Sequence, residues 1–320
     1  MTFVYNPNSS NMSKVKTIDT LVNDIYSYIG GDGEFDLMTD EDAETLGKSL
    51  GEMFKRRLSE RRDPASKTQE FYLRMSNYGM AHRKLWYEAN TPIQKKEVRK
   101  PHLYLNFLIG DIWEEVLLFL AKKTGHKVEY EQETVDVLGQ AGSCDAVIDG
   151  VVVDVKSASK WAFERKFMGG SLYQSDDSFN YVPQIKGYSR GLSLKHDKNF
   201  TQQAFLVGCK EDGRVHLSKV PSYIDVNVEK TIEEAREIIA LPEPPEEKCY
   251  SDEEHTSGNR KIGKNCSFCP FKFDCWKDAN NGQGLRVFDY AGGPVYMTHV
   301  EKVPAKVPEN FSHVFLEEEE

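Results

Sequence analysis

The sequence predicts an α/β protein in which helices flank a mixed central β-sheet. Between residues 105 and 121 the apolar residues recur at helical spacing, which predicts a mostly buried helix. β-Branched runs on both sides of Asp149-Gly150 predict a hairpin. The apolar runs 203–209 and 214–220 predict two further strands. With 320 residues and 39% hydrophobic content, the chain can bury one large core or two modest ones.

The first hundred residues are expected to lie outside this core. Residues 1–36 are rich in Asn, Ser, Gly and Asp, and we expect them to be flexible or peripheral. Thr39 and Asp42 have the spacing of a capping box at the start of a helix. A second helical segment is expected at 78–90, so residues 37–100 are interpreted as an N-terminal helical region.

Residues 101–225 are interpreted as the core. Besides the elements named above, it is predicted to contain strands near 127–138, a loop at 164–182 and a helix that begins at Pro183. Proline suits the first turn of a helix because the missing N–H has no partner there.

The C-terminal third is expected to form two smaller parts. Residues 226–285 are predicted to combine a helix at 228–240 with a cysteine segment that holds a metal. Residues 286–320 are predicted to form a C-terminal extension with an acidic tail.

The hairpin brings two carboxylates together. If Asp149 and Gly150 form the turn, Asp145 and Asp154 stand opposite each other with Cβ atoms about 5 Å apart. Lys156 lies two residues beyond Asp154, so strand alternation places it on the same face. Two acidic side chains this close repel each other unless a cation lies between them, and Mg²⁺ or Mn²⁺ suits oxygen ligands. The alternative is a solvated polar face of the hairpin.

The helix at 105–121 carries two adjacent glutamates, Glu114 and Glu115, beside apolar residues. Burying a carboxylate there is costly without a partner, so Glu114 is a candidate third ligand. Alternatively, both glutamates mark the solvent side of the helix. Downstream, Gln184 and Tyr188 are four residues apart and share one helix face, where they can hydrogen-bond a phosphate or a base edge.

The order of these motifs is specific although each motif alone is weak. It resembles the PD-(D/E)XK nuclease superfamily, and the Gln-x3-Tyr element points to the RecB-like branch. That branch includes nuclease domains of bacterial recombination helicase-nucleases, CRISPR adaptation nucleases and many phage-encoded exonucleases. The resemblance covers roughly residues 74–277 and implies a restriction-endonuclease-like core. The motifs are Gly110-x3-Glu114, Gly142-x2-Asp145, Asp154-x-Lys156 and Gln184-x3-Tyr188.

The resemblance implies that Glu114, Asp145 and Asp154 hold one or two divalent ions, Mg²⁺ or Mn²⁺. The backbone carbonyl of Val155 would be a further ligand. Lys156 would orient or help deprotonate the attacking water. Beside two aspartates its ammonium group should stay charged, so we favour an orienting or electrostatic role.

DNA is the substrate and partner that the resemblance implies, with contacts at Gln184, Tyr188 and Arg83. A recombination or replication protein is a further candidate partner. The formal net charge of -10 is unexpected for a DNA-binding protein but does not exclude one.

Basic residues are nevertheless clustered. The clusters at 55–67, 95–100 and 160–166 could line a groove for a phosphate backbone, with Trp86, Tyr87 and Trp161 available for base stacking. Each cluster could equally be a solvated face of the protein.

Three cysteines form a compact motif. The spacing Cys266-x2-Cys269-x5-Cys275 is typical of a metal-binding loop rather than of disulfides, and Cys249 is the nearest candidate for a fourth ligand. Four thiolates suit Zn²⁺ or a 4Fe-4S cluster, and spacing alone slightly favours zinc. The other two cysteines are expected to be buried thiols: Cys144 and Cys209.

The resemblance favours the cluster, because several RecB-like nucleases close the nuclease domain with a C-x2-C-x5-C triplet around a 4Fe-4S cluster. In those members a further cysteine precedes the core, two residues before the position of Arg83. This chain has Ala81 there. The fourth ligand is therefore open between Cys249, His82 and His255, with thiolate preferred because it is the usual iron–sulfur ligand.

The expected location is the cytoplasm, or the host cytoplasm if the protein is phage-encoded. The sequence has no apolar stretch of membrane-spanning length, so no membrane association is expected. Its beginning lacks the pattern of a signal peptide. Clustered thiols fit a reducing compartment.

The expected function is that of a metal-dependent DNA nuclease. An exonuclease acting in replication, recombination or phage genome processing is favoured. Two alternatives remain: a catalytically idle DNA-binding or assembly module, and an endonuclease of the same fold.

Overall fold

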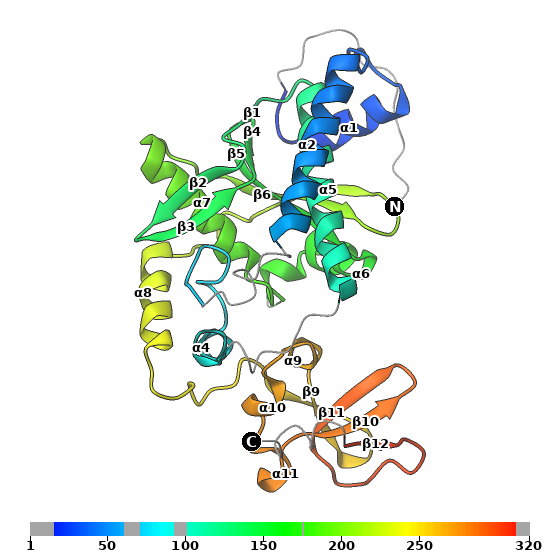
Figure 1. Ribbon diagram of the computed structural model, residues 1–320, viewed down its shortest axis with the longest axis vertical. Coiled ribbons are helices and arrows are strands. Elements are labelled where there is room, and N and C mark those ends of the chain that lie inside the picture. The colour runs from blue at the N-terminus through cyan, green and yellow to red at the C-terminus, as the bar shows by residue number, and fades with distance from the viewer. Residues whose placement is uncertain (1–15, 61–70, 93–100, 175, 312–320) are drawn as a thin grey trace.

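The computed structural model describes residues 16–60, 71–92, 101–174 and 176–311. Its centre is a five-stranded mixed sheet (Figure 1), which confirms the predicted class. Strands β5 and β6 are parallel, and the other neighbours are antiparallel. The strands, in spatial order, are β1 (Val128–Glu129), β4 (Ala146–Ile148), β5 (Val151–Ala158), β6 (Gln203–Cys209) and β7 (Val215–Lys219).

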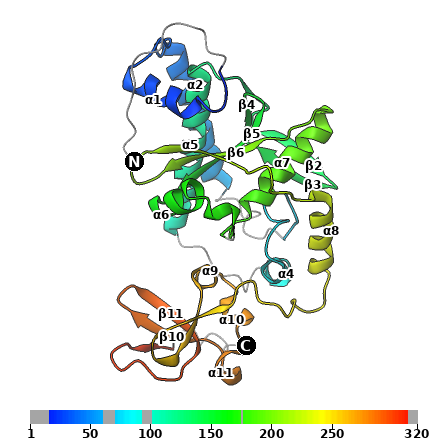
Figure 2. The ribbon, with the colours of Figure 1, turned by 180° about the vertical axis from the view of Figure 1, so that it is seen from behind.

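Helices cover both faces of this sheet, as Figures 1 and 2 show from opposite sides. Helix α5 (Pro101–Lys123) and helix α1 (Leu21–Gly30) share one apolar cluster with the odd-numbered residues of β5. Helix α7 (Tyr181–His196) shares the other cluster with residues such as Val152 and Ala158. The strand alternation therefore divides β5 between two buried layers.

The hairpin has the register that the sequence predicts. Ala146 pairs with Val153, and Ile148 pairs with Val151. Asp149 and Gly150 have φ angles of 51° and 83°, and a two-residue turn with positive φ at both positions matches the twist of the strands. The expected proximity of residues 145 and 154 follows from this register.

Helix α2 (Asp40–Glu60) begins with the expected capping box. The backbone N–H and the hydroxyl of Thr39 donate to Asp42 Oδ2, both at 2.8 Å, and the Asp42 N–H donates back to Thr39 Oγ at 3.1 Å. The helical segment expected at 78–90 is α4 (His82–Asn90), which begins later than predicted.

Three expectations about local structure are corrected. Residues 1–36 were expected to be flexible or peripheral, but helix α1 forms within them because Leu21 and Ile25 are fully buried against α5. The helix at 105–121 is buried only in its C-terminal half, since Leu105 is 62% exposed while Leu117 is fully buried. The apolar spacing continues along the whole helix, but the sheet covers only part of it.

The expected loop at 164–182 is partly helical. Its apolar side chains belong to the apolar cluster that α7 covers, and the chain forms short helices there. Helix α7 itself begins at Tyr181 rather than at Pro183, because the Asp177 carboxylate accepts the N–H groups of Tyr181 and Val182. The short elements are α6 (Lys160–Ala162), the π-helix η2 (Phe163–Met168) and the 3₁₀-helix η3 (Ser171–Tyr173).

A separate two-stranded sheet, β2 (Glu133–Val137) with β3 (Gln140–Cys144), packs on α7. Helix α8 (Val228–Ile239) lies where the sequence predicts it and packs against α4. Within the described ranges, no helix is both long enough and apolar enough to cross a membrane.

The C-terminal part forms a five-stranded sheet at the end of the molecule opposite α1 (Figure 1). This sheet joins strands from both sides of the boundary expected at 285/286. Its spatial order is β12 (Glu309–Asn310), β10 (Arg286–Tyr290), β11 (Gly293–His299), β9 (Arg260–Ile262) and β8 (Asp252–Glu254). The short helices around it are η4 (Thr256–Gly258), α9 (Lys264–Ser267), α10 (Lys272–Cys275) and α11 (Ala279–Gly282).

Gly208 on β6 lets α5 approach the sheet closely. A Cβ atom there would lie 2.4 Å from the ring of Trp113, which is closer than packed atoms can come. We predict that Gly208→Ala lowers the free energy of unfolding by about 1–3 kcal/mol, because overpacking forces the indole or the backbone to shift. Urea denaturation monitored by circular dichroism measures this change.

Gly47→Ala on the exposed side of α2 is the matched control, because no atom lies within 4 Å of the added methyl group. It should stabilise the protein by about 0.5–1 kcal/mol through helix propensity. Equal effects of the two substitutions would contradict the close packing of Trp113 on Gly208.

Candidate active site and cysteine site

Asp154 and Lys156 lie side by side on β5, as predicted. Asp154 is 1% exposed, and Lys156 Nζ is 2.6 Å from Asp154 Oδ2. Among the described groups, the ammonium of Lys156 is the partner of Oδ2, and no other donor reaches this oxygen. A buried carboxylate needs such compensating charge.

Asp145 reaches the same place from the opposite strand. The pairing of β4 with β5 stops at Ala146, and the N–H of Val155 instead donates to Asp145 Oδ2 at 2.7 Å. The Asp145 carbonyl accepts the N–H of Gln132 at 3.1 Å. The Asp145 side chain therefore takes the place of a ladder bond and is held beside Asp154.

Helix α5 supplies Glu114, and the structure separates it from its neighbour. Glu115 accepts a hydrogen bond from the Ser49 hydroxyl on α2. Glu114 points toward the hairpin, where its Oε1 accepts a bond from the Gln132 amide. The side-chain amide oxygen of Gln132 in turn accepts a hydrogen bond from the Ser143 hydroxyl at 3.2 Å. Of the two glutamates, only Glu114 lies on the side of the helix that faces the carboxylates of Asp145 and Asp154.

The three carboxyl groups perturb one another. Burial, followed by the charge of Asp154, raises the pKa of Glu114 to about 7. Burial and the same neighbouring charge raise the pKa of Asp145 well above its usual value. Burial disfavours the charged form of Lys156, but Asp154 and Asp145 outweigh it and raise the lysine pKa. One ammonium group faces three carboxyl groups, whose oxygens are the ligand type that a hard divalent cation prefers. As placed among the described residues, these three side chains are not close enough together to hold one ion.

Helix α7 covers the site with one face. Gln184 Nε2 donates to the Tyr188 hydroxyl at 2.7 Å, which confirms that the two side chains meet. Tyr188 is 5% exposed, and a Cβ on Gly142 would lie 2.8 Å from its ring and 2.5 Å from the Met75 side chain. The Gly142 of the second motif is therefore required by the close approach of Met75 and of α7. The ring of Tyr181 lies 5.0 Å from Lys156 Nζ.

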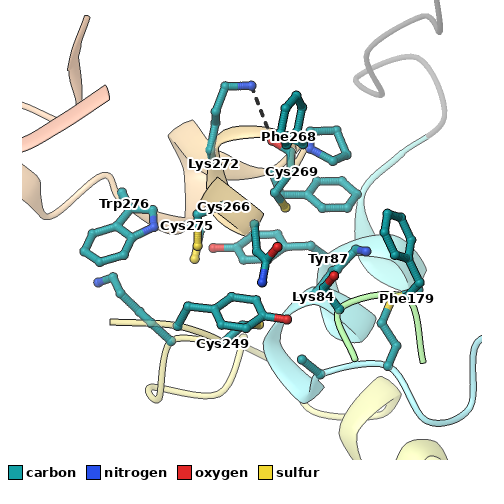
Figure 3. Close-up of a pocket in the computed structure, with 18 of the residues that line it drawn as sticks. Lys84, Tyr87, Phe179, Cys249, Cys266, Phe268, Cys269, Lys272, Cys275 and Trp276 are labelled. Carbon is teal, nitrogen blue, oxygen red and sulfur yellow. Dashed lines mark hydrogen bonds between the residues drawn. The ribbon is translucent and has the colours of Figure 1, made fainter. Parts of the chain in front are cut away.

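The four cysteines of the C-terminal part line one cavity of about 170 Å³. Figure 3 shows Cys266, Cys269 and Cys275 on one side and Cys249, from the segment before β8, on the other. The two histidine alternatives are not among the lining residues: His82 is exposed, and His255 lies against the ring of Tyr290.

The donor set around this cavity fits a metal that binds thiolates. Burial, and then the neighbouring thiols, raise the pKa of Cys266 to about 12. Burial also raises the pKa values of Cys249 and Cys269. Such thiols ionise when a metal ion supplies the positive charge. In the described part of the chain, no three Cys, His, Asp or Glu side chains lie close enough together to hold one metal ion.

The other two cysteines are buried thiols, as expected. Cys144 ends β3, and its Sγ donates to the carbonyl of Ala146. Cys209 ends β6. Neither lines the cysteine cavity.

Arg83 was expected to contact DNA, and this expectation is wrong. The side chain is 8% exposed, and its Nε donates to Cys275 Sγ at 3.2 Å. Its other nitrogens donate to the carbonyls of Cys275 and Pro245. Arg83 therefore joins α4 to the cysteine segment. Tyr87 is not available for base stacking either, because it is buried and stacks on Phe271 at 5.6 Å.

The predicted basic groove is only partly described. Arg57 forms an ion pair with Asp111, and Lys166 is 5% exposed and pairs with Asp176. These two side chains are therefore engaged within the protein. The cluster at 95–100 lies outside the described residues.

Sequence reasoning missed two residues of the site. Tyr181 lies three residues before Gln184 and seven before Tyr188, so helical spacing could have placed all three on one face. Gln132 lies between strands with φ of 51°, where no periodicity indicates a side-chain direction. Its role follows only from the tertiary contact with Glu114.

Comparison with known proteins adds little. No family model and no curated protein matches the chain. One solved structure that it matches is described as "Crystal structure of SSO0001", with a TM-score of 0.37 and 16% sequence identity. The match covers 69% of this chain and 93% of that chain. At this TM-score the similarity carries no argument.

Glu114→Gln should stabilise the protein at high pH when no divalent ion is added. The fold raises the pKa of Glu114 to about 7, so the protonated form contributes stability that is complete below about pH 4.5 and is lost as the pH rises through 7. Glutamine imitates the protonated acid. We expect the variant to gain about 1–3 kcal/mol relative to wild type between pH 5 and pH 8, measured by urea denaturation.

Glu115→Gln is the control for this helix, since Glu115 faces Ser49 rather than Asp145 and Asp154. Adding Mn²⁺ at pH 8 should raise the melting temperature of wild type more than that of Glu114→Gln. A gain that does not depend on pH would contradict the raised pKa of Glu114.

Cys249→Ser and Cys269→Ser should each lower the amount of metal that copurifies with the protein under anaerobic conditions, because each removes a thiolate ligand. Visible absorption separates a 4Fe-4S cluster from zinc, and elemental analysis quantifies both. Cys209→Ser is the matched control and should retain the metal. Full metal content in Cys249→Ser, with loss in His82→Ala or His255→Ala, would show that a histidine is the fourth ligand.

Proposed function

We propose that this protein is a divalent-metal-dependent deoxyribonuclease that hydrolyses phosphodiester bonds, acting as an exonuclease in replication, recombination or phage genome processing. One observation carries the proposal. Helix α5, the segment before β4 and strand β5 carry Glu114, Asp145 and Asp154 near enough that their charges shift one another's pKa values, and Lys156 lies 2.6 Å from Asp154. The motif order that resembles RecB-like nucleases supports the same reaction.

Hydrolysis of a phosphodiester requires an activated water and compensation for negative charge on the transferring phosphate. A bound Mg²⁺ or Mn²⁺ lowers the pKa of its water and stabilises that charge. Glu114, Asp145 and Asp154 would hold the ion, with the Val155 carbonyl as a further ligand. The three carboxylates come from separate segments, so their separation is set by tertiary structure and not by a flexible loop.

The chain's other residues have distinct roles in this reaction. Lys156 remains charged beside Asp154, so it attracts and orients the water or the phosphate rather than accepting a proton. Tyr188 is buried and bonded to Gln184. Its hydroxyl accepts a hydrogen bond from one amide N–H of Gln184. The second N–H and the amide oxygen of Gln184 are left for a phosphate or base edge.

The cysteine site would serve stability rather than chemistry. Cys249, Cys266, Cys269 and Cys275 would hold a 4Fe-4S cluster, or Zn²⁺ as the alternative. The segment that carries them contacts α4 through Arg83. A metal there would therefore join the C-terminal part to the N-terminal helices. The proposed setting is the cytoplasm, with DNA as substrate.

The test is a cleavage assay on linear DNA labelled at its 5′ or 3′ end, single- and double-stranded, and on closed circles, with Mg²⁺ or Mn²⁺. We expect metal-dependent shortening of linear DNA and no cleavage of circles. Asp154→Asn should lower the rate at least about 100-fold, because the ion contributes several kcal/mol to transition-state stabilisation.

Glu131→Gln is the matched control, because this exposed acid pairs with Lys122 on the surface near the same helix. It should leave the rate unchanged. Cleavage of circles would make the enzyme an endonuclease. DNA binding without cleavage, in protein that binds Mn²⁺, would indicate a DNA-binding or assembly module instead.

A further inference from the structure

We propose that Phe179, stacked on Tyr181, is the outer ring of a base-stacking site that holds an unpaired base of the DNA strand entering the site of Lys156. This inference rests on the proposed function and deepens it, because it names the part of the substrate that lies beside the scissile phosphate. The carrying observation is an aromatic pair whose outer ring, Phe179, is exposed and whose inner ring, Tyr181, lies beside the ammonium group of the site.

The geometry of the pair is that of a stacking platform. The rings of Phe179 and Tyr181 are parallel within 18°, with centroids 5.5 Å apart. Tyr181 lies 5.0 Å from Lys156 Nζ, whereas Phe179 is 62% exposed. A side chain that served only to fill the core would be buried. Here the outer ring remains open for a further planar group.

The backbone that carries the pair is held at several points. The Asp177 carboxylate accepts the N–H groups of Tyr181 and Val182, both at 2.8 Å. Asn180 has φ of 60°, the left-handed region, so the chain turns sharply between the two aromatic residues. The platform is therefore anchored by the start of α7, and ordering it on binding costs little entropy.

Lys166 anchors the other side of the same segment. It is 5% exposed, and its Nζ donates to the Asp176 carbonyl at 2.9 Å and to Ser178 Oγ at 3.1 Å. The same nitrogen lies 5.4 Å from the ring of Phe179. Lys166 comes from the π-helix η2, an irregularity that is frequent at functional sites.

The surroundings of the pair suit a nucleic acid. Figure 3 shows Phe179 at the edge of the cysteine cavity, away from Cys266 and Cys275. In a chain of net charge -10, the described residues that line this cavity include no Asp or Glu. They do include three lysines, of which Lys248 pairs with Asp278 and Lys272 is 8% exposed, which leaves Lys84 for a phosphate. An exposed ring near a cation is typical of sites that stack a base beside a phosphate contact.

The experiment measures binding of a short fluorescein-labelled single-stranded oligonucleotide by anisotropy, without added divalent metal so that no cleavage occurs. Phe179→Ala should raise the dissociation constant about 5- to 150-fold, the range for loss of one stacked base. Phe179→Trp should retain the affinity. Phe311→Ala is the control, because Phe311 is similarly exposed, at 54%, in the C-terminal part.

A second set of oligonucleotides, each lacking one base at a successive position, separates stacking from a change in folding. In wild type the affinity should fall when the base at one particular position is absent. In Phe179→Ala, removing that base should have no further effect. Equal affinities of wild type and Phe179→Ala, or the same dependence on the missing base in both, would overturn the stacking site. Neither result bears on cleavage, which the assay with Asp154→Asn decides separately.

Discussion

The burial of Asp154 is the constraint on which the rest of the site depends. A carboxylate that is 1% exposed needs compensating charge, and Lys156 at 2.6 Å supplies one positive charge. The fold then adds two more acids to the same place, Asp145 and Glu114, instead of a second cation. Glu114 responds with a pKa of about 7, so near neutral pH it is partly protonated. The fold thus keeps unfavourable electrostatics that a bound divalent ion would relieve.

Much of this arrangement could be predicted from the sequence because it depends on short-range geometry. The Asp149-Gly150 turn sets the register, the register brings residues 145 and 154 together, and strand alternation adds Lys156. The choice between Glu114 and Glu115 could not be predicted. Adjacent helix residues point in different directions, and only the contact with Ser49, on a helix 66 residues away, shows which one faces the carboxylate site.

The failures share a physical cause, which is that a polar or aromatic residue on a helix does not reveal its tertiary partner. Arg83 had the charge expected of a DNA contact, but the cysteine segment 192 residues later covers it. Tyr87 is covered by Phe271 in the same way. The helix at 105–121 shows the converse, since its apolar spacing is regular although the sheet covers only one half. Local patterns predict which residues can share a face, and long-range packing decides which face is buried.

The two candidate sites are joined by one short segment. Residues 178–180 line the cysteine cavity, and Tyr181 follows directly with its ring beside Lys156. The segment has no regular structure of its own, and its position depends on Asp177, Lys166 and the wall formed by the cysteine segment. A change in the cysteine site therefore has a direct route to the carboxylate site that does not require the core to unfold. A metal held by the four thiols would stabilise the C-terminal part, and through this segment it would also fix the position of the aromatic pair of Phe179 and Tyr181.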